Sequence, residues 1–175
     1  MLKGSRVYLS PLQEKDLPTL FAWINNRESV SHSAPYRPIS DFEHRTWYNS
    51  VSTRSDCVFF LIQRVGDDEA IGSCQLQSIH TVHRNAELRI RIGETANREQ
   101  GFGTEALRLL LRFAFEDLNL ERVYLHAFAT NAVAIRVYEK VGFAREGVLR
   151  RAAYVSGSYV DVIVMGILRD EYARQ

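Results

Sequence analysis

The chain has 175 residues, a length typical of a single domain, and 46% of its residues are hydrophobic while 25% are charged. Long disordered chains combine low hydrophobicity with high net charge, so this composition excludes extended disorder. The 22 basic and 21 acidic residues give a formal net charge of +1, without the basic excess that is usual when nucleic acid is the main partner. We therefore expect one compact domain over residues 1–175 with no nucleic-acid partner.

Neither a metal site nor a membrane segment is expected. His80 and His83 stand three residues apart in a polar stretch that offers no third ligand nearby. Cys57 and Cys74 are too few for a disulfide framework and are expected to be reduced core thiols. Residues 1–10 contain no apolar signal segment, and no stretch approaches 18 consecutive apolar residues. The expectation is therefore a cytoplasmic protein without membrane contact.

The first half of the chain is expected to contain four strands and two helices. In chain order, these are a strand at residues 6–9, helices at 17–24 and 41–51, and strands at 57–62, 70–79 and 86–92. Capping residues precede each helix: Asp16 before the first, and Ser40 or Asp41 before the second, where Glu43 completes a capping box. Along residues 86–92 apolar and charged side chains alternate, which is the period of a strand with one buried face.

The second half is expected to contain two helices and three strands. In chain order, these are a helix at residues 104–118, a strand at 123–129, a helix at 131–141, and strands at 143–151 and 159–168. From Leu107 to Leu118 the apolar residues recur at the spacing of one helical face. Asn131 is suited to cap the later helix and Gly142 to end it. This order predicts an α/β (α+β) fold: one mixed, mostly antiparallel, twisted sheet of about seven strands with helices on both faces.

The most informative segment lies between the strand that ends at residue 92 and the amphipathic helix that follows. It runs through Arg98, Glu99, Gln100, Gly101, Phe102, Gly103 and Thr104. Two glycines one residue apart let the backbone approach a ligand closely, and the helix start presents unpaired N–H groups, so the loop is suited to phosphate. A plain tight turn is the alternative. The lysine of a P-loop is absent, and a dinucleotide fingerprint requires a leading parallel βαβ unit that this order lacks.

Several motifs in the same order give the chain a resemblance to a known family. They are Ala86-Glu87-Leu88, Arg98-x-x-Gly101-x-Gly103, Asn131-x-x-Ala134-x-x-x-Tyr138-x-x-x-Gly142-Phe143, Glu146-Gly147-x-Leu149-Arg150 and Gly157-x-Tyr159-x-Asp161. Together they resemble the GNAT superfamily of N-acetyltransferases. The C-terminal motifs resemble its branch of ribosomal-protein serine/alanine N-terminal acetyltransferases. The resemblance extends from about residue 6 to residue 168 and is strongest over residues 87–147.

The resemblance implies transfer of an acetyl group from acetyl-coenzyme A to a primary amine, by direct attack in a ternary complex and without a metal. A covalent acetyl-enzyme is not expected, because neither cysteine has a recognisable histidine partner. The implied cofactor-binding residues are Ile90, Arg91 and Ile92 through backbone N–H groups freed at a β-bulge, the loop residues Arg98, Glu99, Gln100, Gly101, Phe102, Gly103 and Thr104, and Asn131, Ala134 and Tyr138. For Asn131, a helix cap is an alternative that is compatible with a cofactor contact.

Two side chains are implied in the chemistry. Glu87 stands eleven residues before Arg98, where many family members place a general-base carboxylate, and it is expected to act through a water. The alternative for Glu87 is an ion pair with Arg89 or Arg91 on the same strand face. Tyr138 stands where the family commonly uses a tyrosine to protonate the leaving thiolate. The alternative for Tyr138 is a packed helix tyrosine.

The acceptor pocket of this superfamily is built mainly by the N-terminal helices and nearby loops. Trp23, Asn25, Tyr36 and Trp47 are therefore candidate contacts together with Glu87, because aromatic rings beside polar groups can stack on a sugar, a nucleobase or a peptide. Packing of these aromatic rings in the core is the alternative. A polyamine site would favour a strongly acidic pocket, whereas bases nearby balance the acids of this region. Those acids are Glu14, Asp16, Glu28, Asp41 and Glu43.

We therefore expect the acceptor to be a small-molecule amine such as an amino sugar. The first alternative is the N-terminal α-amine of a protein or peptide. The second is a non-catalytic acyl-coenzyme A-binding module, which the presence of both Glu87 and Tyr138 disfavours. Relatives in the superfamily frequently form homodimers, but no feature of this sequence defines an interface.

Overall fold

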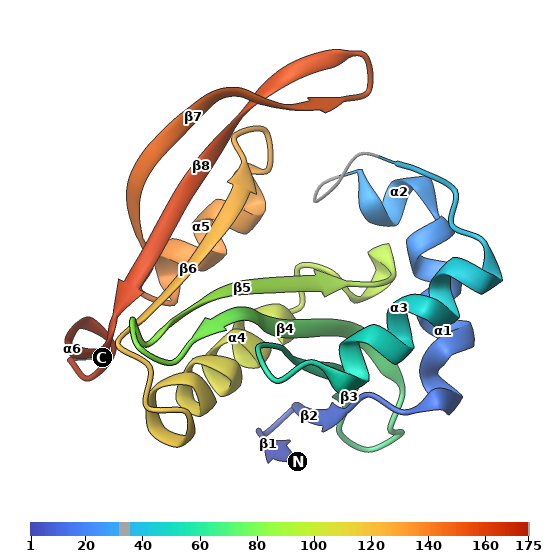
Figure 1. Ribbon diagram of the computed structural model, residues 1–175, viewed down its shortest axis with the longest axis horizontal. Coiled ribbons are helices and arrows are strands. Elements are labelled where there is room, and N and C mark those ends of the chain that lie inside the picture. The colour runs from blue at the N-terminus through green and yellow to red at the C-terminus, as the bar shows by residue number, and fades with distance from the viewer. Residues whose placement is uncertain (32–35, 175) are drawn as a thin grey trace.

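The computed structural model describes residues 1–31 and 36–174. One continuous sheet of eight strands runs through the molecule in the order β1-β2-β3-β4-β5-β6-β8-β7 (Figure 1). The strands are β1 (Leu2–Lys3), β2 (Val7–Pro11), β3 (Val58–Arg64), β4 (Ala70–His80), β5 (Asn85–Ile92), β6 (Arg122–Phe128), β7 (Ala144–Val155) and β8 (Ser158–Leu168). All neighbouring strands are antiparallel except β5 and β6, which are parallel. The predicted mixed, mostly antiparallel sheet is thus confirmed.

Helices of different lengths connect these strands. They are α1 (Leu17–Asn25), α2 (Arg27–Val30), α3 (Asp41–Thr53), α4 (Phe102–Arg112), α5 (Ala132–Lys140) and α6 (Arg169–Tyr172), with 3-10 turns η1 (Glu14–Asp16) and η2 (Thr95–Asn97) and a π-helical turn η3 (Phe113–Asp117). Across the described residues, no helix is long and apolar enough to cross a membrane.

The sheet has an apolar layer on each face, and β3 shows why. Because side chains alternate along a strand, Phe60 and Ile62 enter the large core, which also holds the apolar face of α4. Leu61, between them, joins a second cluster with Leu20 and Trp23 of α1. A strand that is apolar on both faces must be covered on both, so helices lie on both sides of the sheet, as predicted.

Most predicted elements are present, with small differences at their ends. The sheet has eight strands rather than about seven because β1 contributes two residues that pair with β2, too few to produce a periodic pattern. Helix α4 begins at Phe102, two residues earlier than expected, and its C-terminal end widens into η3. Helices α2 and α6, each of four residues, were not predicted. Elements this short carry no sequence periodicity.

The predicted helix caps are largely present. Ser40 and Glu43 form the expected capping box at α3, each side chain bonded to the backbone of the other residue. Asn131 Oδ1 accepts the Ala134 N–H at the start of α5, and Gly142 follows the helix with φ 101°, a conformation that glycine adopts readily. Asp16, in contrast, makes no side-chain cap at α1, because its carboxylate accepts the Gln13 N–H at the preceding turn.

The parallel pair β5–β6 is very short. Only Asn85, Ala86 and Glu87 are in register with β6, opposite residues 122–124, and beyond them the two strands separate (Figure 1). The family resemblance implied a β-bulge here that frees N–H groups at about residues 90–92. That detail is wrong: β5 is regularly paired with β4 from Glu87 to Ile92, and the register shift in this pair lies near Gln77 and His80. Because β6 pairs with β8 along its whole length, the gap opens only on the side of β6 that faces β5.

Gly93, just after β5, is packed against Trp23. A Cβ built at Gly93 would lie 2.2 Å from Trp23 Cε2, so we expect Gly93→Ala to displace the indole and destabilise the fold by about 1–3 kcal/mol, as overpacking usually does. Urea denaturation would measure this loss. Gly147→Ala is the matched control, because a Cβ there meets nothing within 4 Å and should leave the unfolding midpoint nearly unchanged. Equal midpoints for both variants would contradict the packing argument.

Candidate active site

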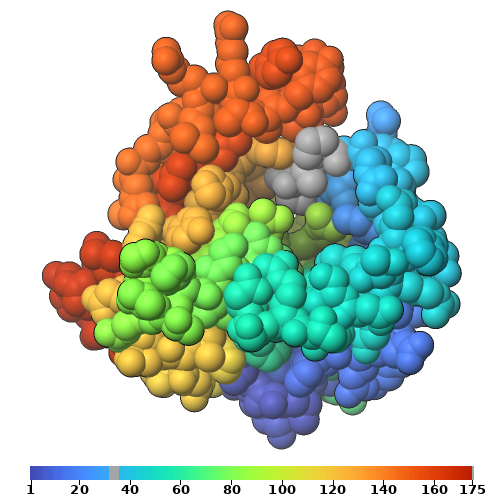
Figure 2. All heavy atoms as spheres, viewed as in Figure 1, coloured from blue at the N-terminus to red at the C-terminus, as the bar shows by residue number. Residues whose placement is uncertain are grey.

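The molecule is hollowed where β5 and β6 separate. In Figure 2 the hollow lies between the orange β7–β8 hairpin and the blue and cyan helices α2 and α3. Glu87, Arg89 and Arg91 share the strand face that is opposite the large core, because Ala86, Leu88 and Ile90 point the other way. The strand that borders the gap therefore has one polar face and one face in the core.

Three side chains hold Glu87, which is the last residue of β5 that pairs with β6. Its Oε2 accepts a hydrogen bond from Gln77 Nε2 at 2.6 Å, and its Oε1 lies 3.3 Å from both Arg89 Nε and His126 Nδ1. Gln75 Nε2 in turn donates to Gln77 Oε1 at 2.7 Å, which orients the Gln77 amide. The carboxylate is only 12% exposed, so its position is fixed by neighbours on three strands.

The charge state of Glu87 follows from this environment. Burial alone would raise the pKa of the carboxyl group, but the Gln77 hydrogen bond, the charge of Arg89 and the His126 hydrogen bond together bring the pKa below its usual value. Glu87 is consequently a carboxylate at neutral pH. A buried, oriented carboxylate beside an open gap is a common arrangement in acid–base sites.

Tyr138 lies on α5, which packs against the large core from the α4 side of the sheet. Its ring is partly buried and meets Phe143 at a centroid distance of 6.0 Å. Burial raises the pKa of Tyr138 to about 12, so the phenol is fully protonated at neutral pH. Its hydroxyl takes part in none of the hydrogen bonds found within the described residues, so the proton is available for donation to a ligand.

The glycine loop leads directly into α4, as predicted. Glu99 and Gly101 both have positive φ, 57° and 87°, and Gly101 is the N-cap of the helix. No side chain caps this end, so the backbone N–H groups at the start of α4 are free of side-chain acceptors. Gly103 lies against Ile92, where a Cβ would be 3.7 Å from Cγ1. N–H groups and a helix dipole in this arrangement are suited to an anion.

The opening residues of the chain hold this loop in place. Arg6 Nη1 donates to the Gln100 carbonyl oxygen at 2.7 Å, and the guanidinium carbon of Arg6 lies 4.5 Å from the centre of the Phe102 ring. Glu105, in the first turn of α4, accepts hydrogen bonds from the Arg6 N–H at 2.9 Å and the Ser5 hydroxyl at 3.1 Å. The loop is therefore connected to the β1–β2 turn at the far edge of the sheet.

The remaining residues predicted for the cofactor lie around the gap. Arg91 is partly buried; burial lowers the pKa of its guanidinium group, and the positive charges of Arg89 and Arg98 lower it further. Gln100 Nε2 donates to the Ala96 carbonyl oxygen, which makes its side chain part of the loop scaffold. Thr104 and Ala134 are half-buried in the first turns of α4 and α5.

Besides Glu87, four residues were predicted to contact the acceptor, and two of them lie on α1. Trp23 is 6% exposed and belongs to the second apolar cluster. Asn25 uses both side-chain atoms on one neighbour: Nδ2 donates to the Ile39 carbonyl oxygen at 3.0 Å, and Oδ1 accepts the Ile39 N–H at 2.8 Å. Trp23 thus shows the core packing that was the stated alternative, and Asn25 links α1 to the segment before α3.

The other two show similar packing. Trp47 stacks on His44 at 5.2 Å between ring centres and meets the edge of Phe59 at 5.3 Å. Tyr36 lies under the Arg27 guanidinium, 4.9 Å from the ring centre. The structure brings none of these rings into hydrogen-bonding contact with Glu87.

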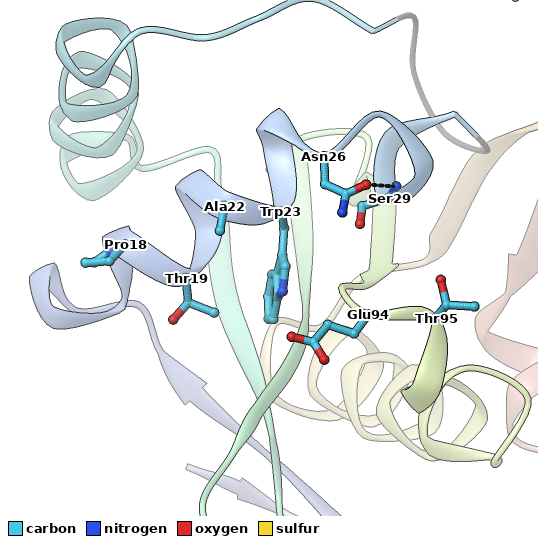
Figure 3. A pocket seen from close by; sticks show the side chains of 8 residues that line it. All are labelled: Pro18, Thr19, Ala22, Trp23, Asn26, Ser29, Glu94 and Thr95. Atoms are coloured by element: carbon cyan, nitrogen blue, oxygen red, sulfur yellow. Dashed lines mark hydrogen bonds between the residues drawn. The ribbon is translucent and has the colours of Figure 1, made fainter.

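A pocket of about 550 Å³ lies beside Trp23, between α1, α2 and the segment after β5 (Figure 3). It is lined by Pro18, Thr19, Ala22, Trp23, Asn26, Ser29, Glu94 and Thr95. The Trp23 ring and the Glu94 carboxylate both extend toward its interior, and Asn26 Oδ1 accepts the Ser29 N–H beside it. The residues on the polar face of β5 do not line it, so it is distinct from the gap.

Sequence reasoning missed His126 and Gln77, which contact Glu87 from β6 and β4. Both lie in stretches that were correctly predicted to be strands, but which residues face Glu87 depends on register, which a single sequence does not show.

The sequence predicted no metal site and two core thiols. Within residues 1–31 and 36–174, no three His, Cys, Asp or Glu side chains are grouped as metal ligands. Both cysteines are buried, and burial raises the pKa of each thiol.

Comparison with known proteins identifies a single family. The acetyltransferase (GNAT) domain family model matches residues 6–144. Spermidine N(1)-acetyltransferase of Vibrio cholerae is 31% identical over 171 residues, which cover 97% of this chain and 96% of that protein. The solved structure of the Vibrio cholerae spermidine N-acetyltransferase in complex with CoA and spermine gives a TM-score of 0.90 at 30% identity, covering 97% of this chain and 99% of that one.

The ribosomal branch indicated by the C-terminal motifs is not singled out by these comparisons. A putative ribosomal N-acetyltransferase of Bacillus subtilis, YdaF, is 33% identical, but over 106 residues that cover 61% of this chain and 57% of that protein. The similarity to the spermidine enzymes extends over nearly the whole chain. The expectation is therefore corrected to the wider family.

The hydrogen bond from Gln77 provides a direct test of the Glu87 environment. Because this bond lowers the pKa of Glu87, we expect Gln77→Leu to raise that pKa toward or above its usual value, as burial then dominates. Carboxyl ¹³C NMR titration would measure the shift. Gln63→Leu, on β3, is the control and should leave the Glu87 titration unchanged. An unchanged titration in Gln77→Leu would show that the bond does not set the charge state.

Proposed function

Because the chain belongs to the GNAT family and is an acetyl-coenzyme A-dependent N-acetyltransferase, we propose that it acetylates a small-molecule primary amine by direct attack on the thioester, with Glu87 and Tyr138 as its acid–base groups. The observation that carries this proposal is the oriented, ionised Glu87 carboxylate at the point where β5 and β6 separate. A carboxylate there can promote the loss of a proton from an amine that enters the gap.

The first requirement of the reaction is a neutral amine. An alkyl ammonium group with a pKa near about 10 has no lone pair at neutral pH and cannot attack. The negative charge of Glu87 attracts the ammonium group, and the carboxylate can act as the base that accepts its proton through a water. Since a side chain that is only 12% exposed holds its geometry, the amine would be aligned as well as activated.

The second requirement is polarisation of the thioester carbonyl group. Beyond Glu87 the edge of β5 that faced β6 is no longer paired with it, so the backbone groups on this edge of residues 88–92 face the gap, while those on the other edge pair with β4. We propose that N–H groups among Ile90, Arg91 and Ile92 hold the carbonyl oxygen and the pantetheine chain. Fixed backbone donors are efficient stabilisers of a developing oxyanion.

The third requirement is stabilisation of the leaving thiolate. Tyr138 is proposed as the donor, since its phenol is protonated and not committed to a hydrogen bond within the described residues. The N–H groups at the start of α4, with Gly101 and Gly103, are proposed to hold the phosphates of the cofactor, and Asn131 and Ala134 to lie beside its pantetheine arm.

The identity of the acceptor is the finer part of the proposal. The full-length similarity to spermidine acetyltransferases supports a polyamine such as spermidine, in place of the amino sugar expected from the sequence. One observation favours the amino sugar over a polyamine. Arg89 is 62% exposed and 3.3 Å from Glu87, so it places a positive charge beside the amine site, where it would repel a polycation. Two of the acidic residues that could attract a polycation form ion pairs instead, Asp41 with Arg45 and Glu43 with Arg37.

Loss of the Tyr138 hydroxyl tests the leaving-group role. We expect Tyr138→Phe to lower kcat by about 100-fold, a typical loss for a removed general acid, and to leave the KM for acetyl-coenzyme A within about twofold. Steady-state thioester consumption would measure both constants. Tyr154→Phe, on the exposed face of β7, is the matched control. A raised KM with an unchanged kcat would show that Tyr138 only binds the cofactor.

An acceptor panel tests the reaction itself. With acetyl-coenzyme A present, we expect turnover of spermidine to exceed that of an amino sugar and of peptides that begin with Ser or Ala. Preferred turnover of the amino sugar would assign the Arg89 charge a role in specificity. Preferred turnover of the peptides would support protein N-termini as acceptors. Tight acetyl-coenzyme A binding with no turnover of any amine would contradict the enzymatic proposal and favour a binding module.

A further inference from the structure

His126 lies across the gap from Glu87, on the other strand of the separating pair. It is two residues beyond Tyr124, the last residue of β6 in register with β5. Its Nδ1 is 3.3 Å from Glu87 Oε1, and the edge of its ring meets Tyr124 at 5.9 Å between ring centres. The side chain is 39% exposed. No hydrogen bond to Nε2 is found within the parts of the chain that the structure describes.

Glu87 alone is poorly suited to take a proton from an amine. Both of its oxygens already accept hydrogen bonds, the shortest of them 2.6 Å from Gln77 Nε2. Protonation would set the new O–H against donors that point at the same oxygens. It would also remove the charge that these donors stabilise. The arrangement favours a permanent carboxylate rather than a carboxyl group that titrates during turnover.

An imidazole held by a carboxylate has the complementary properties. When one ring nitrogen donates to a carboxylate, the neutral tautomer is fixed and the second nitrogen carries the lone pair. The carboxylate then stabilises the imidazolium ion that forms on protonation, which is the logic of the histidine–aspartate pair in hydrolases. An ordinary imidazole titrates near about pH 6.5, within the range in which a base can both accept and release protons.

We propose that Glu87 and His126 act as a dyad in which His126 Nε2 accepts the proton of the acceptor amine, while Glu87 orients the ring through Nδ1. The inference rests on the proposed function and reassigns its proton-accepting step from Glu87 to His126. Glu87 becomes the positioning residue, and no proton needs to reside on its carboxylate.

The proton balance of the reaction is then complete. The ammonium nitrogen transfers one proton to His126 Nε2, and the imidazolium later releases it to water. The neutral amine forms a C–N bond to the carbonyl carbon, and the C–S bond breaks with its electron pair on sulfur. The nitrogen releases its second proton to water, Tyr138 delivers its own proton to the sulfur, and water reprotonates Tyr138, so that one proton is released to solvent overall.

Charged and aromatic groups surround His126. Glu87 and Arg89 lie on β5, Tyr124 lies beside His126 on β6 with Arg122 over the Tyr124 ring, and the register partner of His126 on β8 is Val164. The negative charge of Glu87 stabilises a positive charge on the ring, and the positive charge of Arg89 opposes it. Removing the Glu87 carboxylate would therefore remove both the acceptor that orients the ring and the charge that stabilises the imidazolium ion.

The test compares pH–rate profiles of His126→Gln, Glu87→Gln and the control His83→Gln, an exposed turn histidine. The acceptor is spermidine, or whichever amine of the panel is turned over fastest. In His126→Gln we expect kcat/KM to fall about 100-fold and the acidic limb of the profile to disappear, with acetyl-coenzyme A affinity by calorimetry unchanged. In Glu87→Gln, which loses the carboxylate that orients the ring, kcat/KM should fall while the acidic limb remains. His83→Gln should match the original protein.

Other outcomes separate the two proposals. If His126→Gln retains the rate and the acidic limb while Glu87→Gln loses both, the dyad is overturned and Glu87 is the direct base. If both variants keep the full rate, the role of Glu87 in the proposed function fails as well. Imidazole ¹⁵N NMR provides a readout that is independent of turnover: a neutral ring protonated at Nε2 rather than Nδ1 would overturn the dyad.

Discussion

The early end of the β5–β6 pairing is the constraint on which the candidate site depends. Two parallel strands that stayed in register would satisfy each other's backbone groups and close the sheet. Here pairing ends after three positions, although β6 stays paired with β8 and β5 stays paired with β4 beyond that point. The same divergence leaves backbone donors of β5 unpaired and holds a carboxylate on one strand opposite an imidazole on the other. Both sets of groups are fixed by strands, so they need no rearrangement before a ligand arrives.

Local patterns were sufficient to predict most of the fold and part of the site. The alternation over residues 86–92 placed Glu87 on a polar strand face, and the capping box at Ser40 and the glycine that follows α5 marked helix ends correctly. These features depend on neighbours within a few residues. The β-bulge expected at residues 90–92 was wrong because the gap arises from the path of β6, which is a long-range property of the sheet.

The residues that could not be predicted share one property: their role depends on contacts between segments distant in sequence. His126 contacts Glu87 although the two are 39 residues apart in the sequence, and Gln77 contacts Glu87 from the neighbouring strand β4. Conversely, Trp23 and Trp47 were candidate ligand contacts because they are aromatic residues with polar neighbours, but both pack in an apolar cluster around β3. Aromatic rings are driven by the area they bury, so a single sequence cannot distinguish a ring that stacks on a ligand from one that packs on a neighbouring helix.

The contact between Arg6 and the glycine loop has a practical consequence for handling the protein. The carbonyl oxygen of Gln100, the Phe102 ring and the Glu105 carboxylate all depend on residues 5 and 6, which precede the first long strand. A fusion tag or a shortened start that disturbs these residues would loosen the loop from a distance, although no tag atom came near it. A weak affinity for the cofactor in such a preparation would then reflect the engineered terminus and not the native loop.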